Sequence, residues 1–284
     1  MKQLHRIVQK GQFHWVGDGF PVRTMFSYAT PDAEISPFLL LDYAGPAEFT
    51  PASKPRGVGF HPHRGFETVT ILYQGEVEHR DTAGNGGLIG PGDVQWMTAA
   101  KGLLHEEMHS AAFTRQGGTF EAIQLWVNLP AKNKMDEPHY QPIVQAQIPE
   151  VKLDQKGSVM RVIAGVYESQ KGPAKTYTPI NLWDLRLRPE QSLAFDLPES
   201  HSTLLFALKG GVLVNRTDIL NDAELAIFVR KGKTIELTAH GDSTLLILSG
   251  EPIDEPIAGY GPFVMNTQAE IRQAMTDFGY PDYK

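Results

Sequence analysis

The sequence contains no cysteine, and that absence excludes several kinds of chemistry at once. Without thiols the chain cannot form a disulfide framework, a thiolate nucleophile or a zinc site of the cysteine type. Any metal ion must therefore be held by nitrogen and oxygen ligands. The lack of cysteine also fits a reducing compartment, so we expect a cytoplasmic protein.

Long apolar runs and dense basic blocks are missing as well. We find no stretch of about 18 apolar residues that could cross a bilayer, and the first fifteen residues are too polar for the apolar core of a secretory signal. The net charge is -7, and no cluster of Lys and Arg offers the phosphate contacts that non-specific nucleic-acid binding needs. We expect no membrane segment and no direct nucleic-acid binding, which leaves contact with a DNA-binding protein open.

Length and turn residues favour two domains built from strands. The chain has 284 residues, about twice the usual ~150 per domain, and its 27 glycines and 20 prolines indicate many turns. Short apolar or alternating runs recur between Gly, Pro and Asp breaks, at 68–73, 94–97, 122–127, 203–208, 224–229 and 244–248. Such spacing predicts an all-β fold, either a sandwich or a barrel.

A weak internal repeat indicates that this strand-rich fold is duplicated. Residues 70–75 resemble residues 205–210 at a shift of 135 residues, each an apolar strand that ends in a polar-Gly turn. We place the boundary near residue 145, which gives domains 1–145 and 146–284. Near the end of the second domain, Thr267 and Glu270 have capping-box spacing and apolar residues follow at helical intervals, so we expect a short C-terminal helix.

Two pairs of side chains in the first half have the spacing of metal ligands. His61 and His63 lie two residues apart, and on an extended chain both imidazoles point to the same face. His105 and Glu107 repeat this spacing, whereas Glu106 points the other way. A lone H-x-H is most often a pair of surface histidines, but two such pairs in one half of a Gly-rich β protein favour a metal site. These four N/O ligands suit Fe, Mn, Ni, Cu or Zn, and an octahedral ion would keep two positions open.

Longer segments around these pairs resemble the pirin family. Residues 59–69, GFHPHRGFETV, look like the first cupin motif in the form that pirins carry, and residues 91–99 with 102–107 are similar to the second. Residues 124–130 and 261–267 also match. The resemblance is strong over 23–140, thin over 145–255, and returns in the final segment.

The resemblance implies two tandem jelly-roll-like cupin barrels with one metal ion, usually Fe(2+), in the N-terminal barrel. Its ligands would be His61, His63, His105 and Glu107. The C-terminal barrel of pirins has lost its ligands, and the repeat agrees, because His105 and Glu107 fall on His240 and Asp242 while the other two ligands fall on Asp196 and Pro198. We interpret His240 and Asp242 as a relic of the duplicated site.

One departure concerns the carboxylate ligand. General cupins draw it from the Glu that follows H-x-H, here Glu67, whereas pirins use the Glu of H-x-E. Sequence periodicity cannot choose, because Glu67 has the same parity as His61 and His63. The pirin match favours Glu107, and Glu67 stays open as an alternative ligand or as a hydrogen-bond partner of the ligands.

The remaining candidates receive plainer interpretations. Aromatic side chains near the ligands could wall a pocket for a flat aromatic molecule or simply fill the core; they are Phe60, Phe66, Trp96 and Trp126. His109 could line the pocket mouth. Solvated positions are expected for the other histidines outside the repeat, namely His5, His14, His79, His139 and His201. Glycine-rich turns lack the following helix of a phosphate loop, so nucleotide binding is not expected.

Two functions from different classes follow from the resemblance. In the first, the protein is a dioxygenase that cleaves flavonols such as quercetin, with Glu107 as both metal ligand and base. In the second, it is a redox-responsive regulator whose metal alters the surface offered to a transcriptional or metabolic protein partner. A structural metal without function is the least attractive reading. An enzyme should open its metal onto a pocket, whereas a sensor could shield it.

Overall fold

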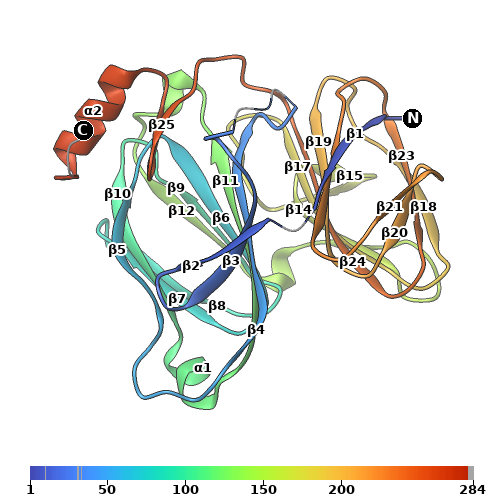
Figure 1. Cartoon of the computed structure of the whole chain (residues 1–284), viewed down its shortest axis with the longest axis horizontal. Coiled ribbons are helices and arrows are strands. Elements are labelled where there is room, and N and C mark those ends of the chain that lie inside the picture. Colours follow the sequence, from blue (N-terminus) through green and yellow to red (C-terminus); the bar gives the residue numbers. More distant parts are fainter. Residues whose placement is uncertain (10, 31, 33, 281–284) are drawn as a thin grey trace. The chain divides into compact units, whose positions relative to one another are not determined.

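The computed structural model describes residues 1–9, 11–30, 32 and 34–280, and its regular structure is mostly β-strand (Figure 1). Contacts divide the chain into two compact units. The first barrel comprises Gln12–Pro31, Phe38–Gln145 and Ile253–Lys284, and the second barrel comprises Met1–Gly11, Asp32–Pro37 and Ala146–Pro252. The prediction of two β-barrels is confirmed.

The first barrel contains a seven-stranded and a four-stranded antiparallel sheet. The larger sheet has the order β12-β9-β6-β11-β4-β3-β2, with bounds His139–Ile143, Val94–Thr98, Phe66–Gln74, Gly118–Asn128, Phe38–Phe49, Phe20–Ser27 and Gln12–Val16. The smaller sheet has the order β5-β10-β7-β8, with bounds Gly57–His63, Leu103–His109, Val77–Asp81 and Gly86–Ile89. Short helices α1 (Ala111–Gln116), η1 (Ala131–Asn133) and η2 (Gln145–Gln147) connect strands or follow them.

The second barrel repeats this strand order. Its larger sheet is β1-β22-β19-β24-β17-β14-β13, with bounds Leu4–Val8, Glu224–Phe228, Ser202–Lys209, Ser243–Gly250, Ile180–Leu187, Val159–Ala164 and Glu150–Lys152. Its smaller sheet is β18-β23-β20-β21, with bounds Ser192–Asp196, Thr234–Ala239, Val212–Val214 and Asp218–Leu220. A small hairpin joins β15 (Val166–Tyr167) to β16 (Gln170–Lys171). The duplication predicted from the repeat is therefore present as architecture.

The two ends of the chain do not follow the single boundary predicted near residue 145. Strand β1 pairs with β22, so the N-terminal strand belongs to the second barrel. Strands β25 (Ala258–Tyr260) and β26 (Phe263–Met265) and helix α2 (Gln268–Asp277) belong to the first barrel instead. Pairing of β1 with a strand more than 200 residues away leaves no local pattern, so this exchange of chain ends could not be predicted.

Helix α2 forms where the sequence predicts a helix. The Thr267 side chain accepts a hydrogen bond from the Glu270 backbone N–H, and the Glu270 side chain accepts one from the Thr267 backbone N–H. Ile271, Ala274 and Met275 are buried against β25 and β26. Neither this helix nor any other in the described ranges is both long and apolar enough to span a membrane.

Candidate metal centre

Three histidines from two neighbouring strands converge in the first barrel. His61 and His63 lie on β5, and their ring centroids are 4.8 Å apart. In the antiparallel pairing of β10 with β5, His105 stands opposite His61, and its ring lies 4.3 Å from that of His61 and 4.9 Å from that of His63. One ligand atom from each ring lies within 4.8 Å of the others. The H-x-H spacing and the facing strand thus produce a three-imidazole cluster.

The ring nitrogens of this cluster fit a metal ion. His61 Nδ1 lies 2.9 Å from the Gly59 carbonyl oxygen, which orients the ring and leaves Nε2 free. Within the described residues, His105 is fully buried with neither ring nitrogen hydrogen-bonded, and His63 Nδ1 also lacks a partner. Burial lowers the pKa of all three imidazoles, which keeps them neutral with a lone pair to donate.

Glu107 lies beside the cluster but is not part of it. Residues alternate between buried and half-exposed along β10, so Glu107 shares the inward face with His105, while Glu106 faces outward and pairs with Arg80. The Glu107 carboxylate accepts a hydrogen bond from Thr70 Oγ1 at 3.3 Å. Burial raises the pKa of Glu107 to about 7. The structure therefore places a buried carboxyl group with a raised pKa next to the three histidines.

An irregularity in β5 explains how these side chains share one face. Between His105 and Glu107 the partner residues on β5 step from His61 to Val58, so one extra residue is accommodated in β5. Gly59 and Phe60 at this bulge are exposed, and the Phe60 ring lies under the Arg80 guanidinium. Bulges commonly re-aim side chains near active sites. Here the bulge turns Phe60 outward, and both Val58 and His61 line the cavity.

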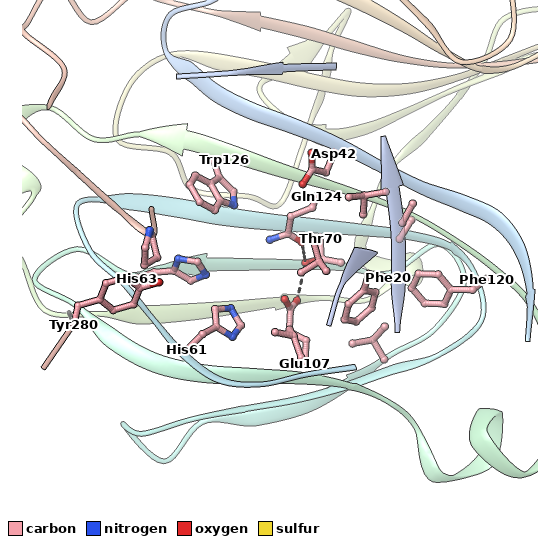
Figure 2. A pocket seen from close by; sticks show the side chains of 17 residues that line it. Phe20, Asp42, His61, His63, Thr70, Glu107, Phe120, Gln124, Trp126 and Tyr280 are labelled. Carbon is pink, nitrogen blue, oxygen red and sulfur yellow. Dashed lines mark hydrogen bonds between the residues drawn. The ribbon is translucent and has the colours of Figure 1, made fainter. Parts of the chain in front are cut away.

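The cluster opens onto a cavity of about 280 Å³ inside the first barrel (Figure 2). His61, His63 and Glu107 line it, and most of the remaining wall is apolar or aromatic. Of the four aromatic residues considered from sequence, Trp126 lines the cavity and Phe66 stacks on Trp126 at 4.3 Å. Trp96 is buried elsewhere and Phe60 is 49% exposed, so neither forms the wall.

Several cavity residues were missed from sequence because they come from distant strands. Phe20 lies on β3, Asp42 on β4 and Gln124 on β11, and Tyr280 follows α2. Figure 2 shows their side chains directed into the same space as the histidines. The only sequence signal was the period-two alternation of these strands, which marks a face without saying what the face encloses.

Glu67 lies on the other face of β6. Thr70 lines the cavity, and side chains alternate along a strand, so Glu67 points away from the histidines. Its carboxylate accepts a hydrogen bond from Thr98 Oγ1 at 2.7 Å, and burial raises its pKa to about 7. The parity shared with His61 and His63 is lost because the chain turns at Arg64 and Gly65 into another sheet. Glu67 is therefore not positioned to bind a metal ion at the three histidines or to hydrogen-bond their rings.

The other histidines divide into exposed and buried groups. His5, His14 and His139 are exposed, as predicted, but His79 and His201 are buried, so the prediction of solvated side chains was wrong for these two. The His79 ring shares a hydrogen bond of 2.5 Å with the Tyr140 hydroxyl, and His201 Nδ1 shares one of 3.3 Å with the Ser249 hydroxyl.

His109 does not line the cavity among the described residues. It is packed among phenylalanine rings and shares a hydrogen bond of 3.0 Å with the Gly19 carbonyl oxygen. In the second barrel, β23 ends at Ala239, so His240 lies beyond the strand and is exposed, and Asp242 pairs with Arg188 at 3.1 Å. These two residues therefore do not form the relic of a site. The interior of that barrel is filled by an apolar core.

The C-terminal segment forms part of the cavity wall. Val264 N–H donates to the Arg64 carbonyl at 3.0 Å, and Arg64 directly follows His63. Buried Lys134 donates to the carbonyls of Gly65 and Val264 at 2.7 and 2.9 Å, and the Arg64 side chain reaches Asp277 at 2.7 Å. Pro262 and Tyr280 from this segment line the cavity. Gly65 has φ +91°, and a Cβ there would lie 2.0 Å from the Val264 carbonyl oxygen, so this close approach requires glycine.

Sequence comparisons cover nearly the whole chain. Residues 19–127 match the family described as Pirin, and residues 182–282 match the Pirin C-terminal cupin domain. A protein of Pseudomonas aeruginosa, "Putative quercetin 2,3-dioxygenase PA2418", is 56% identical over 98% of this chain and 97% of that protein. The "Pirin-like protein" of Solanum lycopersicum is 38% identical over 92% of this chain and 86% of that protein.

Solved structures show the same fold. The crystal structure of quercetin 2,3-dioxygenase from Acinetobacter baumannii is 53% identical, has a TM-score of 0.96, and is matched over 98% of this chain and 97% of that chain. The bacterial pirin YhhW in complex with nickel(II), from Escherichia coli, is 21% identical with a TM-score of 0.65, over 87% of this chain and 100% of that chain. At that identity the second likeness shows the fold alone.

Proposed function

The chain belongs to the pirin family, and on that premise we propose that it is a metal-dependent dioxygenase that cleaves flavonols such as quercetin with O₂. The observation that carries the proposal is the opening of the three-histidine cluster onto an apolar, aromatic-lined cavity. A cavity of about 280 Å³ beside the ligands suits a substrate better than a shielded sensor. The two relatives named after quercetin 2,3-dioxygenase support the same substrate class.

We propose His61, His63, His105 and Glu107 as the residues that hold the ion. Iron, as Fe(2+), is the proposed metal, with Mn, Ni, Cu and Zn as alternatives; nickel occupies the Escherichia coli pirin. Bound there, the ion would supply Lewis acidity at the substrate oxygen and the one-electron chemistry that O₂ requires. The cysteine-free composition supports a cytoplasmic location.

The residues of the chain have separate tasks in this proposal. Glu107, with a pKa raised to about 7 by burial, takes the proton of the substrate's 3-hydroxyl group at its carboxylate. Thr70 holds that carboxylate in place, because its hydroxyl lies 2.7 Å from Gln124 Oε1 and 3.3 Å from Glu107 Oε1. Trp126 and the other aromatic rings of the wall orient a flat substrate and exclude water.

Oxygen uptake with quercetin tests this function. Iron-reconstituted protein should consume O₂ and release CO, whereas the His61→Ala, His63→Ala double variant of equal fold content should do neither. A His5→Ala, His240→Ala double variant is the matched control, because it removes two exposed imidazoles that belong to the second barrel and do not line the cavity. If the fully metallated parent consumes no O₂, the dioxygenase proposal is wrong, and the redox-responsive regulator with a protein partner becomes the better account.

A further inference from the structure

A row of polar side chains crosses the larger sheet of the first barrel, and three of the four line the cavity. Thr70 on β6, Gln124 on β11, Asp42 on β4 and Thr24 on β3 stand directly opposite one another on four neighbouring strands. Thr70 donates to Gln124 Oε1 at 2.7 Å, and Thr24 donates to Asp42 Oδ1 at 2.5 Å. Figure 2 shows Gln124 between Asp42 and Thr70, with Glu107 beyond Thr70.

Two groups in this row have hydrogen-bonding capacity left over. Among the described residues, Thr24 is the only hydrogen-bond donor to the Asp42 carboxylate, and it uses Oδ1, so Oδ2 is left as an acceptor at the cavity. Gln124 accepts through Oε1, and its amide nitrogen donates to no described residue. Asp42 is only 7% exposed. A nearly buried carboxylate with a free oxygen is costly unless a ligand or water completes its hydrogen bonds.

The residues around Asp42 and Gln124 limit which ligand groups can use these free hydrogen-bonding atoms. Around the row the wall is built from aliphatic and aromatic residues, among them Val22, Ala44, Phe120 and Ala122. A carboxylate acceptor beside an amide donor matches a phenolic hydroxyl group, which donates one hydrogen bond and accepts another. Burial raises the pKa of Asp42, and a ligand that donates to its carboxylate would offset that cost.

We propose that Asp42, assisted by Gln124, recognises a hydroxyl group of the substrate other than the reacting one, so that the enzyme prefers flavonols that carry further hydroxyl groups. Strand spacing sets the reach: Asp42 is two strands from Thr70, or roughly 10 Å along the sheet. The hydroxyl group that binds Asp42 is therefore not the one that reaches Glu107. This inference rests on the proposed function, because it takes the reacting end of the substrate to lie at the histidines.

Equilibrium binding to the metal-loaded protein without O₂ tests the inference, with quenching of tryptophan fluorescence as the signal, since Trp126 lines the cavity. Quercetin is compared with 3-hydroxyflavone, which keeps the reacting hydroxyl and lacks the others. Wild type should prefer quercetin, and Asp42→Asn should weaken quercetin about tenfold to hundredfold, as expected for a hydrogen bond to a charged group. The affinity for 3-hydroxyflavone should change by less than about twofold on the same reasoning.

Two further variants guard against a trivial result. Gln124→Met removes the donor from another strand and should reduce the same preference. Glu67→Gln alters a buried carboxyl on the opposite face of the sheet and should leave the preference unchanged. Equal binding of both flavonols by wild type, or an undiminished preference in Asp42→Asn, would overturn the role of Asp42 while leaving the proposed function intact. Binding of neither flavonol would overturn both.

Discussion

Two buried carboxyl groups, Glu67 and Glu107, differ in surroundings although burial raises the pKa of each to about 7. Glu107 faces the cavity and the three histidines, whereas Glu67 faces the other side of the sheet. A raised carboxyl pKa beside candidate ligands serves proton transfer. The raised pKa of Glu67, which lies away from the cavity, affects folding stability instead, and that effect can be measured.

We predict that Glu67 makes folding stability fall as pH rises. Its pKa is raised from 4.5 to about 7, so the folded state binds the proton more tightly, and stability is greatest below pH 4.5 and is lost through pH 7. Between pH 5 and 8, wild type should lose about 2 kcal/mol more unfolding free energy than Glu67→Gln.

Urea denaturation at both pH values measures this difference. The exposed carboxyl of Glu137 provides a control, because Glu137→Gln should track wild type at both pH values. Parallel losses in wild type and Glu67→Gln would contradict the prediction.

Residue identity alone could not assign these roles. His61, His63 and His105 lie together, as the H-x-H and H-x-E spacings predict, because the alternation of side chains along a strand is a local rule. His79 shows the limit of that rule. It shares the inward face of β7 with Val77 and is covered by Tyr140, whose strand pairs elsewhere in the barrel. Burial of this kind depends on long-range packing that one strand does not reveal.

At the level of elements, local patterns specified the strands and the final helix. Each of the six apolar runs falls on a strand, from β6 to β24, although the strands extend up to four residues beyond the runs. What the sequence could not show is the bulge at Gly59 and Phe60, which depends on the pairing of β5 with β10. That bulge decides that Phe60 faces solvent, so one of the four aromatic candidates was misplaced for a reason of register.

The capping box of α2 supports a prediction about the cavity wall. Thr267→Ala removes the hydroxyl that accepts the Glu270 N–H at 3.2 Å, and loss of such a cap should lower the free energy of unfolding by about 1 kcal/mol. Because the segment that carries this helix is hydrogen-bonded to Arg64, next to His63, metal affinity should fall as well.

Chemical denaturation and metal titration test both effects. Thr276→Ala is the matched control on the same helix, since its hydroxyl bonds only the Arg272 carbonyl of the preceding turn. If Thr267→Ala and Thr276→Ala lower stability and metal affinity equally, the N-terminal cap of α2 does not stabilise the cavity wall.

For the whole molecule, the exchanged chain ends predict which pieces can fold. Residues 1–145 alone carry β1 without β22 and lack β25, β26 and α2. We predict that this fragment does not unfold cooperatively. A chain in which 12–145 is joined to 253–284 by a flexible Gly/Ser linker should, because it contains the complete first barrel.

Thermal melting followed by circular dichroism compares the two chains, and binding of Fe(2+) reports whether the histidines assemble. Cooperative melting of 1–145 at the same temperature as the joined chain would show that the C-terminal segment is dispensable. The internal repeat predicts two barrels. It does not predict that each barrel needs one end of the chain, because β1 and the C-terminal segment contact residues that are distant in the sequence.

The same exchange constrains how the protein is made in the cell. Strand β1 leaves the ribosome first, yet its partner β22 lies ~220 residues later, which at roughly 5–20 residues per second takes roughly 10–45 s. The first barrel waits longer still, for a segment that is synthesised last. Both halves of the nascent chain therefore remain unfinished until translation is nearly complete, so acquisition of the metal is expected to follow release from the ribosome rather than accompany synthesis.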